Sequence, residues 1–160
     1  MKHDELIAEF LKSETNPDCG FSLPNGFDLS TIQTLLPPVA CFPKLFIKLY
    51  NSFSFDEFDS TPLTFLGNND FNEGEEIVDY FENNLSFIRE CCDLGYLPFA
   101  RHETGSYDPI CFDLGSKNLS DGDCKIVRLD HEHILQFNNA IIIENIAISL
   151  YDFMKSKVDS

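Results

Sequence analysis

The sequence predicts an α+β fold: a single domain over residues 1–160, with a mainly antiparallel sheet and helices packed on it. Apolar residues recur at helical spacing in the first half, over residues 77–92 and near the C-terminus. Elsewhere they gather in short runs bounded by Gly, Pro or polar residues, which is typical of strands. The strand-like runs of the second half are joined by short loops. This favours antiparallel pairing, because a parallel connection needs a longer crossover.

Helices are expected in five segments. They cover residues 2–13, a short stretch from Asp28 or Ser30 to Leu35, the segment from Pro43 to Tyr50, residues 77–92 and residues 142–158. Pro43 suits a helix start, because the first turn does not use the N–H that proline lacks. Asn83-Asn84 leaves open a break within the fourth segment. Gly95 lies just past its end, where helices commonly need a left-handed residue.

Strands are expected in four segments, at residues 62–67, 96–100, 108–114 and 124–130. In the third segment Ile110, Phe112 and Leu114 alternate with other residues, so they share one face of the strand. A hairpin-like polar loop separates the third strand from the fourth. The chain of 160 residues is long enough for one domain with a core of its own.

Polar residues flank the predicted strands of the second half. Asp108, Asp113 and Asp130 stand where aspartates commonly hold turns or loops by accepting bonds from backbone N–H groups. His131 and Glu132 follow directly and either do the same or line a surface groove. We expect these residues to belong to the scaffold, with ordinary histidines near a strand end.

Charge is the strongest global property of the chain. It carries 27 Asp and Glu against 11 Lys and Arg, which gives a formal net charge of −16. Such a chain is repelled by nucleic acid and by anionic membranes, and it is attracted to a basic partner. No apolar run approaches the ~18 residues that span a bilayer, and acids interrupt the N-terminus where a signal peptide needs an apolar core. We therefore expect a cytoplasmic protein.

The six cysteines, at positions 19, 41, 91, 92, 111 and 124, are expected to be reduced. Disulfides belong mainly to exported proteins, and no export signal is found. Several cysteines stand among apolar residues, as Cys41 does in "VACF" and Cys111 in "PICF". A free cysteine behaves as a small apolar residue, so we expect these thiols in the core.

Metal and catalytic motifs are missing. No Cys-x-x-Cys or His-Glu-x-x-His occurs, and the nearest zinc-like set, Cys111, Cys124, His131 and His133, has no structural-zinc spacing. No Gly-x-Ser-x-Gly elbow and no glycine-rich phosphate loop occurs. We expect no catalytic residue, no metal and no cofactor. An enzyme or metal protein that uses those four residues stays open as an alternative.

The segment "NNDFNEGEE" alternates Asn68, Asp70 and Asn72 as a calcium-binding EF-hand loop does. However, the sixth position is Glu73 where that loop needs glycine, and the twelfth is Asp79 where it needs glutamate. We interpret the segment as an acidic loop that leads into a helix, where carboxylates favour the positive end of the helix dipole.

Four features occur in order along residues 96–135. They are "LPFA" at 97–100, Gly105, "DPICFD" at 108–113, and Val127 followed by "DHE" at 130–132. This combination resembles the C-terminal half of the SUKH superfamily, which includes bacterial immunity proteins and a fungal regulator of cell-wall glucan synthesis. A second likeness covers residues 36–52, through Leu36-Pro37 and Asn51, with Ser52 in place of the usual glycine. The tryptophans frequent in the family are absent from this chain.

The resemblance implies a SUKH-like domain that is not an enzyme and that binds and neutralises a toxin protein. A toxin that acts on nucleic acid tends to be basic, and an acidic inhibitor would reach it quickly. The candidate contact residues lie in expected loops or helix starts and are Asp56, Glu57, Asp59, Asp70, Glu73, Glu75 and Glu76. A non-catalytic regulatory scaffold of the same fold is the alternative.

Overall fold

The computed structural model describes residues 2–15, 27–69, 74–118 and 120–160. Within these ranges one sheet runs through six strands in chain order, so neighbours in the sheet are neighbours in the sequence. The strands are β1 (Phe58–Ser60), β2 (Leu63–Phe65), β3 (Tyr96–His102), β4 (Ile110–Asp113), β5 (Lys125–Leu129) and β6 (Ile142–Ala147). All pairs are antiparallel, and the predicted α+β class is confirmed.

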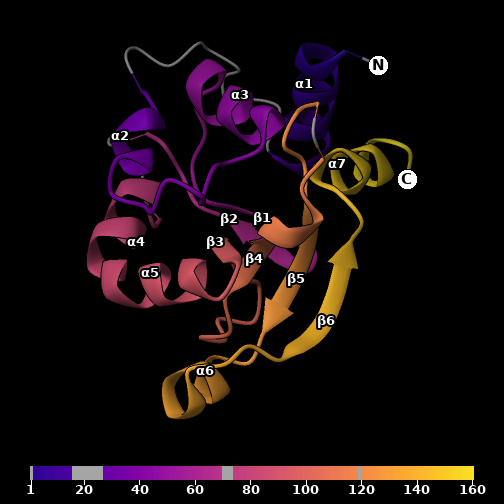
Figure 1. Ribbon diagram of the computed structural model, residues 1–160. Coiled ribbons are helices and arrows are strands. Elements are labelled where there is room, and N and C mark those ends of the chain that lie inside the picture. Colours follow the sequence, from indigo (N-terminus) through magenta and orange to yellow (C-terminus); the bar gives the residue numbers. More distant parts are fainter. Residues whose placement is uncertain (1, 16–26, 70–73, 119) are drawn as a thin grey trace.

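The helices pack around this sheet. They are α1 (His3–Glu14), α2 (Ser30–Gln33), α3 (Lys44–Ser52), α4 (Ile77–Asn83), α5 (Leu85–Asp93), α6 (His131–Phe137) and α7 (Leu150–Val158). Figure 1 shows α1, α3 and α7 above the sheet, α4 and α5 beside it, and α6 below it. Residue Asn84 separates α4 from α5, at the break that the sequence left open. No helix in the described ranges is long and apolar enough to cross a membrane.

Two apolar clusters hold the layers together. In the larger one, Phe99 and Phe112 stack with ring centroids 3.9 Å apart, and Phe46 of α3 meets both rings edge-on at 5.4 Å. The smaller cluster contains Cys91, Cys111, Val127, Leu129 and Ile134 and lies between the sheet, α5 and α6. Successive strand residues point to opposite faces, so Ile110 and Phe112 join the larger cluster while Cys111 joins the smaller one.

The prediction of one helix over residues 142–158 is wrong in its first half, which forms β6. The β-branched isoleucines of this half suit a strand, and apolar residues on both faces imitate helical spacing. Helix α7 begins only at Leu150, because Ser149 accepts a bond from the backbone N of Asp152. The buried carboxylate of Asp123 adds bonds from the N–H groups of Leu150 and Tyr151.

His131 and His133 follow the end of β5, as expected, and the structure adds that both belong to a helix, α6. Asp130 ends the extended chain by accepting from the N–H groups of Glu132 and His133, as a helix cap does. Asp113 similarly accepts from Gly115 N, and Leu114 therefore begins a 3-10 turn instead of continuing β4. The role predicted for these aspartates, accepting backbone bonds beside strands, is confirmed.

Candidate binding surface

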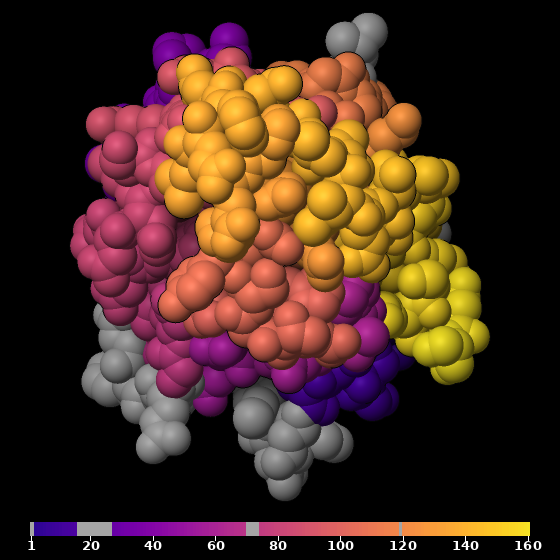
Figure 2. All heavy atoms as spheres, turned by 90° about the horizontal axis from the view of Figure 1, so that it is seen from below, coloured from indigo at the N-terminus to yellow at the C-terminus, as the bar shows by residue number. Residues whose placement is uncertain are grey.

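A pocket of about 540 Å³ opens between α4, α5, β3, the loop of residues 103–109 and α6. Figure 2 looks onto this face, where α6 and β6, in light orange and yellow, lie beside the salmon loop and the surface is hollowed towards the pink α5. Charged groups, aromatic rings and small polar groups share the lining. Its residues are Glu75, Tyr80, Asn84, Phe87, Ala100, Arg101, Ser106, Tyr107, Asp108, Pro109, His131 and Leu135.

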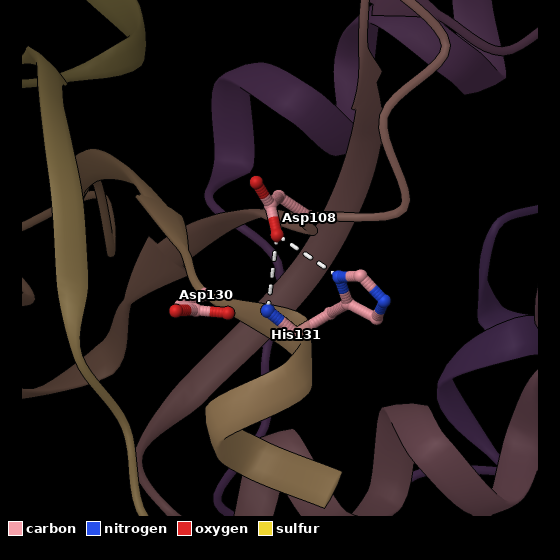
Figure 3. Close-up of side chains that lie close together, drawn as sticks. All are labelled: Asp108, Asp130 and His131. Carbon is pink, nitrogen blue, oxygen red and sulfur yellow. Dashed lines mark hydrogen bonds and ion pairs between the residues drawn. The ribbon is translucent and has the colours of Figure 1, made fainter.

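Asp108 and His131 form one wall of the pocket. A single Asp108 oxygen, Oδ1, accepts from the backbone N and approaches the ring Nδ1 of His131, both at 3.0 Å (Figure 3). The second ring nitrogen, Nε2, points away from Asp108. The carboxylate thereby ties the loop before β4 to the first residue of α6, although the two are 23 residues apart in sequence.

The environment of Asp108 keeps its carboxyl group ionised. Burial by itself raises its pKa, but bonds from the backbone and ring of His131 and from Ser106, with the nearby Arg128 charge, outweigh burial and lower the pKa below 3.8. An ionised carboxylate only accepts hydrogen bonds, so Nδ1 of His131 carries the hydrogen. A neutral His131 ring therefore presents Nε2 as an acceptor.

Glu75 and Arg101 form the opposite charged pair of the lining, with Oε1 and Nη1 3.5 Å apart. The segment of Glu75 is held in place by Glu57, whose carboxylate accepts from the backbone N of Glu75. Gly74 permits this approach: its φ is +106°, and a Cβ there would lie 2.8 Å from the Cβ of Glu57. Two acidic segments that are distant in sequence therefore meet beside the pocket.

Exposed apolar side chains lie on and beside α6 and β6, and one of them, Leu135, also lines the pocket. We call them the apolar strip, and they are Leu135, Phe137, Ile141, Ile142, Ile143 and Ile148. Residues 134–149 contain a single charged side chain, Glu144, whereas a chain with 24% charged residues would place about four in such a segment. A large exposed apolar area on a soluble domain commonly marks an interaction site.

Strand β6 lies at one edge of the sheet, so its outer backbone groups are unpaired in the sheet. However, its pairing with β5 shifts register twice, between Ile126 and Val127 and between Arg128 and Leu129. Such irregularities bend a strand and make it a poor template for another strand. The apolar strip therefore offers side chains for packing and not a regular sheet edge.

The structure divides the acidic residues predicted as contacts. Glu75 lines the pocket, and the Glu57 carboxylate accepts a bond from the backbone N of Glu75. Asp59 lies in β1 and not in a loop or helix start, and its carboxylate accepts from Thr64 across the hairpin. Glu76 forms an isolated bridge with Gly67 at the start of α4, and Oδ1 of Asp56 is buried with no bond to a described residue. Asp70 and Glu73 lie outside the described residues.

Three possible metal ligands, from Asp108, Asp130 and His131, lie within 4.8 Å of one another. Several of their polar atoms are already engaged: Asp130 Oδ1 caps α6, and Asp108 Oδ1 meets the backbone N and Nδ1 of His131. The Nε of Arg128 also lies 3.7 Å from Asp108 Oδ2, where its positive charge would repel a cation. This arrangement serves the start of α6, and it does not fit a metal centre.

The zinc-like set considered from the sequence is not assembled. Cys111 and Cys124 belong to different apolar clusters, and neither joins a group of potential ligands among the described residues. Burial raises the pKa of Cys91, Cys92 and Cys124 to about 12, and that of Cys111 well above 9.0, so these thiols stay protonated at neutral pH.

The cysteine positions differ in part from expectation. All described cysteines are free, and those at 91, 92, 111 and 124 are buried as predicted. Cys41 is exposed, so its predicted place in the core is wrong. Its neighbours Ala40 and Phe42 are buried, and Cys41 points outward with its thiol donating to the Pro38 carbonyl. Cys19 lies outside the described residues.

Asn68, the first position of the calcium-like segment, has a structural role. Its amide donates to the carbonyls of Tyr50 and Phe53, and its Oδ1 accepts from Phe55 N. The side chain is buried and fixes the chain between α3 and β1. Asp70 and Asn72 lie outside the described residues.

Comparison with protein-family models, with curated proteins and with solved structures finds no match to this chain. The surface is therefore interpreted from its own chemistry. The sequence pointed to Asp108, His131 and Glu75 but not to Arg101, Tyr107 or the apolar strip. The nearly uncharged run of residues 134–149 was the available signal, and helical spacing concealed it.

Proposed function

We propose that this protein binds and neutralises a basic toxin domain in the cytoplasm, and that the pocket and the apolar strip form its docking surface. The observation that carries the proposal is the position of this apolar, pocketed surface on a molecule of net charge −16. Protein interfaces commonly combine a desolvated apolar centre, a polar rim and a pocket that receives one anchoring side chain. The α6–β6 face offers exposed apolar side chains and an adjoining pocket, which support this proposal.

Charge supports a basic partner. A net charge of −16 attracts a cationic protein over long range and raises the association rate, most strongly at low salt. Fast association matters for a protein that must inactivate a toxin before damage occurs. The apolar strip then supplies short-range affinity that charge alone does not provide, because exposed ion pairs contribute little.

The resemblance of residues 96–135 to the SUKH superfamily also favours neutralisation of a toxin. The residues that carry it have structural roles near the surface: Asp108 and Asp130 fix the start of α6, and Gly105 turns the 103–109 loop with a φ of +80°. The resembling segment thus builds the side of the pocket formed by the loop and α6.

The test is rescue of growth. Bacteria expressing a toxin-like protein, sought among the products of neighbouring genes, are co-transformed with the intact chain, and survival is scored. The proposal expects survival and a stable complex of the two purified proteins, which Leu135→Ser weakens and Val39→Ser does not. Death of the co-transformed cells and no complex would refute it. Complex formation without rescue would favour the regulatory scaffold.

A further inference from the structure

The lining of the pocket carries more negative than positive charge. Glu75 and Asp108 supply two carboxylates, and Arg101 supplies one guanidinium. His131 in its neutral form adds an acceptor at Nε2. Behind the lining, the positive charge of Arg128 is shared between Asp108 and Glu144, at 3.7 and 3.5 Å. The local balance therefore has the same sign as the whole molecule.

The ion pair in the pocket leaves Glu75 able to accept another donor. Charge-assisted N–H···O bonds are commonly about 2.7–2.9 Å long. The Glu75–Arg101 contact is longer, at 3.5 Å, and about a third of each side chain remains exposed. The backbone of Glu75 is fixed by Glu57, so its carboxylate is held at the pocket, and among the residues that the structure describes its side-chain contact is the 3.5 Å one to Arg101.

Aromatic rings complete a site suited to a flat cation. Tyr80, Phe87 and Tyr107 line the pocket, and the side chain of Tyr107 stands in solvent. Guanidinium groups stack on such rings and also donate to carboxylates through a planar set of N–H groups. Burial raises the pKa of Tyr80, so that its ring stays neutral.

We propose that this pocket binds a guanidinium group, as the receptor for an arginine side chain of a basic protein. Its volume of about 540 Å³ accommodates one long side chain together with water. Glu75 accepts from the guanidinium, and the rings stack on it. The preference for guanidinium rests on the pocket itself, whereas the origin of the arginine in a toxin rests on the proposed function.

The experiment uses the full-length protein and argininamide as the probe. Backbone amide shifts are followed by NMR during titration, and citrullinamide, which has the same shape without the charge, is titrated in parallel. We expect saturable shifts at Ala100, Arg101, Asp108 and His131 with argininamide and none with citrullinamide. Equal shifts with both probes, no saturable shifts at the pocket, or a stronger response there to acetate would overturn the proposal.

Two variants of the same ion pair sharpen the test. Glu75→Gln removes the accepting charge and should weaken argininamide binding about two- to fivefold, the range of a partly exposed ion pair. Arg101→Gln removes the competing cation and should strengthen binding. Loss of local structure would move both affinities in the same direction, and that outcome would contradict the proposal. Glu82→Gln, an exposed change of equal charge on α4, should leave affinity unchanged.

The result separates the two proposals. Argininamide binding in the pocket without neutralisation of any toxin would support the guanidinium site and refute the proposed toxin neutralisation. Neutralisation of a toxin without argininamide-induced shifts at the pocket would support the proposed function and refute the guanidinium site.

Discussion

Asp108 links two segments of the chain through a single side-chain oxygen. It accepts from the backbone of His131 and meets its ring, and its second oxygen faces Arg128 at 3.7 Å. A carboxylate that accepts several donors stabilises the folded state only while it is ionised. The position of α6, and with it that of Leu135 at the pocket, is therefore fixed only while Asp108 is ionised.

Replacement of Asp108 tests this dependence. Asp108→Ala removes the acceptor and is expected to lower the free energy of unfolding by about 1–2 kcal/mol, as loss of a helix cap does. Asp108→Asn keeps an oxygen acceptor without the charge and should cost less. Urea unfolding at pH 7 measures both effects, and equal costs for the two variants would contradict the role of the bonds.

The pH dependence of that difference has a defined sign. The folded-state pKa of Asp108 lies below 3.8, so its ionised form is favoured by folding. The stability advantage of the wild type over Asp108→Asn is fully present above about pH 4 to 5 and is lost as pH falls through the lowered pKa. Urea unfolding at successive pH values checks this, and an advantage that grows on acidification would contradict it.

Thiol reactivity tests the described cysteines. Burial raises the pKa of Cys91, Cys92 and Cys124 to about 12, whereas Cys41 is exposed. We expect iodoacetamide to label Cys41 in the native protein and to spare these three and Cys111 until urea is added. Mass spectrometry of the labelled peptides reports each site, and rapid native labelling of Cys111 would contradict the described core.

At the scale of elements, Phe112 of β4 holds the helix layer to the sheet. It stacks on Phe99 and meets Phe46 of α3 edge-on. Phe112→Ala should lower the free energy of unfolding by about 3–5 kcal/mol, because it leaves a cavity in the core. Phe137→Ala removes the same ring from the exposed strip and should change stability by less than about 0.5 kcal/mol. Comparable losses, measured by urea unfolding, would contradict the placement of the two rings.

Local sequence patterns predicted most helices and strands. They failed where hydrogen bonds between distant residues determine where an element begins or ends. Helices α1 and α3 and the alternation of Ile110 and Phe112 follow from spacing alone. The start of α7 depends on a local cap by Ser149 and also on Asp123, a distant residue whose carboxylate accepts a bond from Leu150 N. No local pattern contains that bond.

The pocket shows the same limit. Asp108 and His131 could each be identified as polar residues that flank strands, but not as partners, because they are 23 residues apart in sequence. Arg101 could not be placed opposite Glu75 from the sequence, because their approach depends on the pairing of β2 with β3 and on the contact of Gly74 with Glu57. Exposure of the isoleucines in β6 depends on its position at the edge of the sheet.

At the scale of the whole molecule, the proposed function gives charge and apolar surface separate roles. The net charge of −16 acts over about a Debye length, roughly 8 Å at physiological salt, and mainly changes how fast a basic partner arrives. The apolar strip acts only on contact and mainly changes how slowly the partner leaves. We therefore expect added salt to lower the association rate strongly and the dissociation rate little.

The most direct measurement is the binding kinetics of the basic toxin domain that the proposed function requires, sought among the products of neighbouring genes. The wild type, Leu135→Ser and Val39→Ser are compared across salt concentrations. The two serine variants remove apolar side chains of similar exposure, 63% for Leu135 and 68% for Val39. Leu135 belongs to the apolar strip and lines the pocket, whereas Val39 belongs to neither. The account predicts about tenfold faster dissociation for Leu135→Ser, no change for Val39→Ser, and association that slows with salt for all three. Identical kinetics for the two variants, or association that quickens with salt, would contradict it.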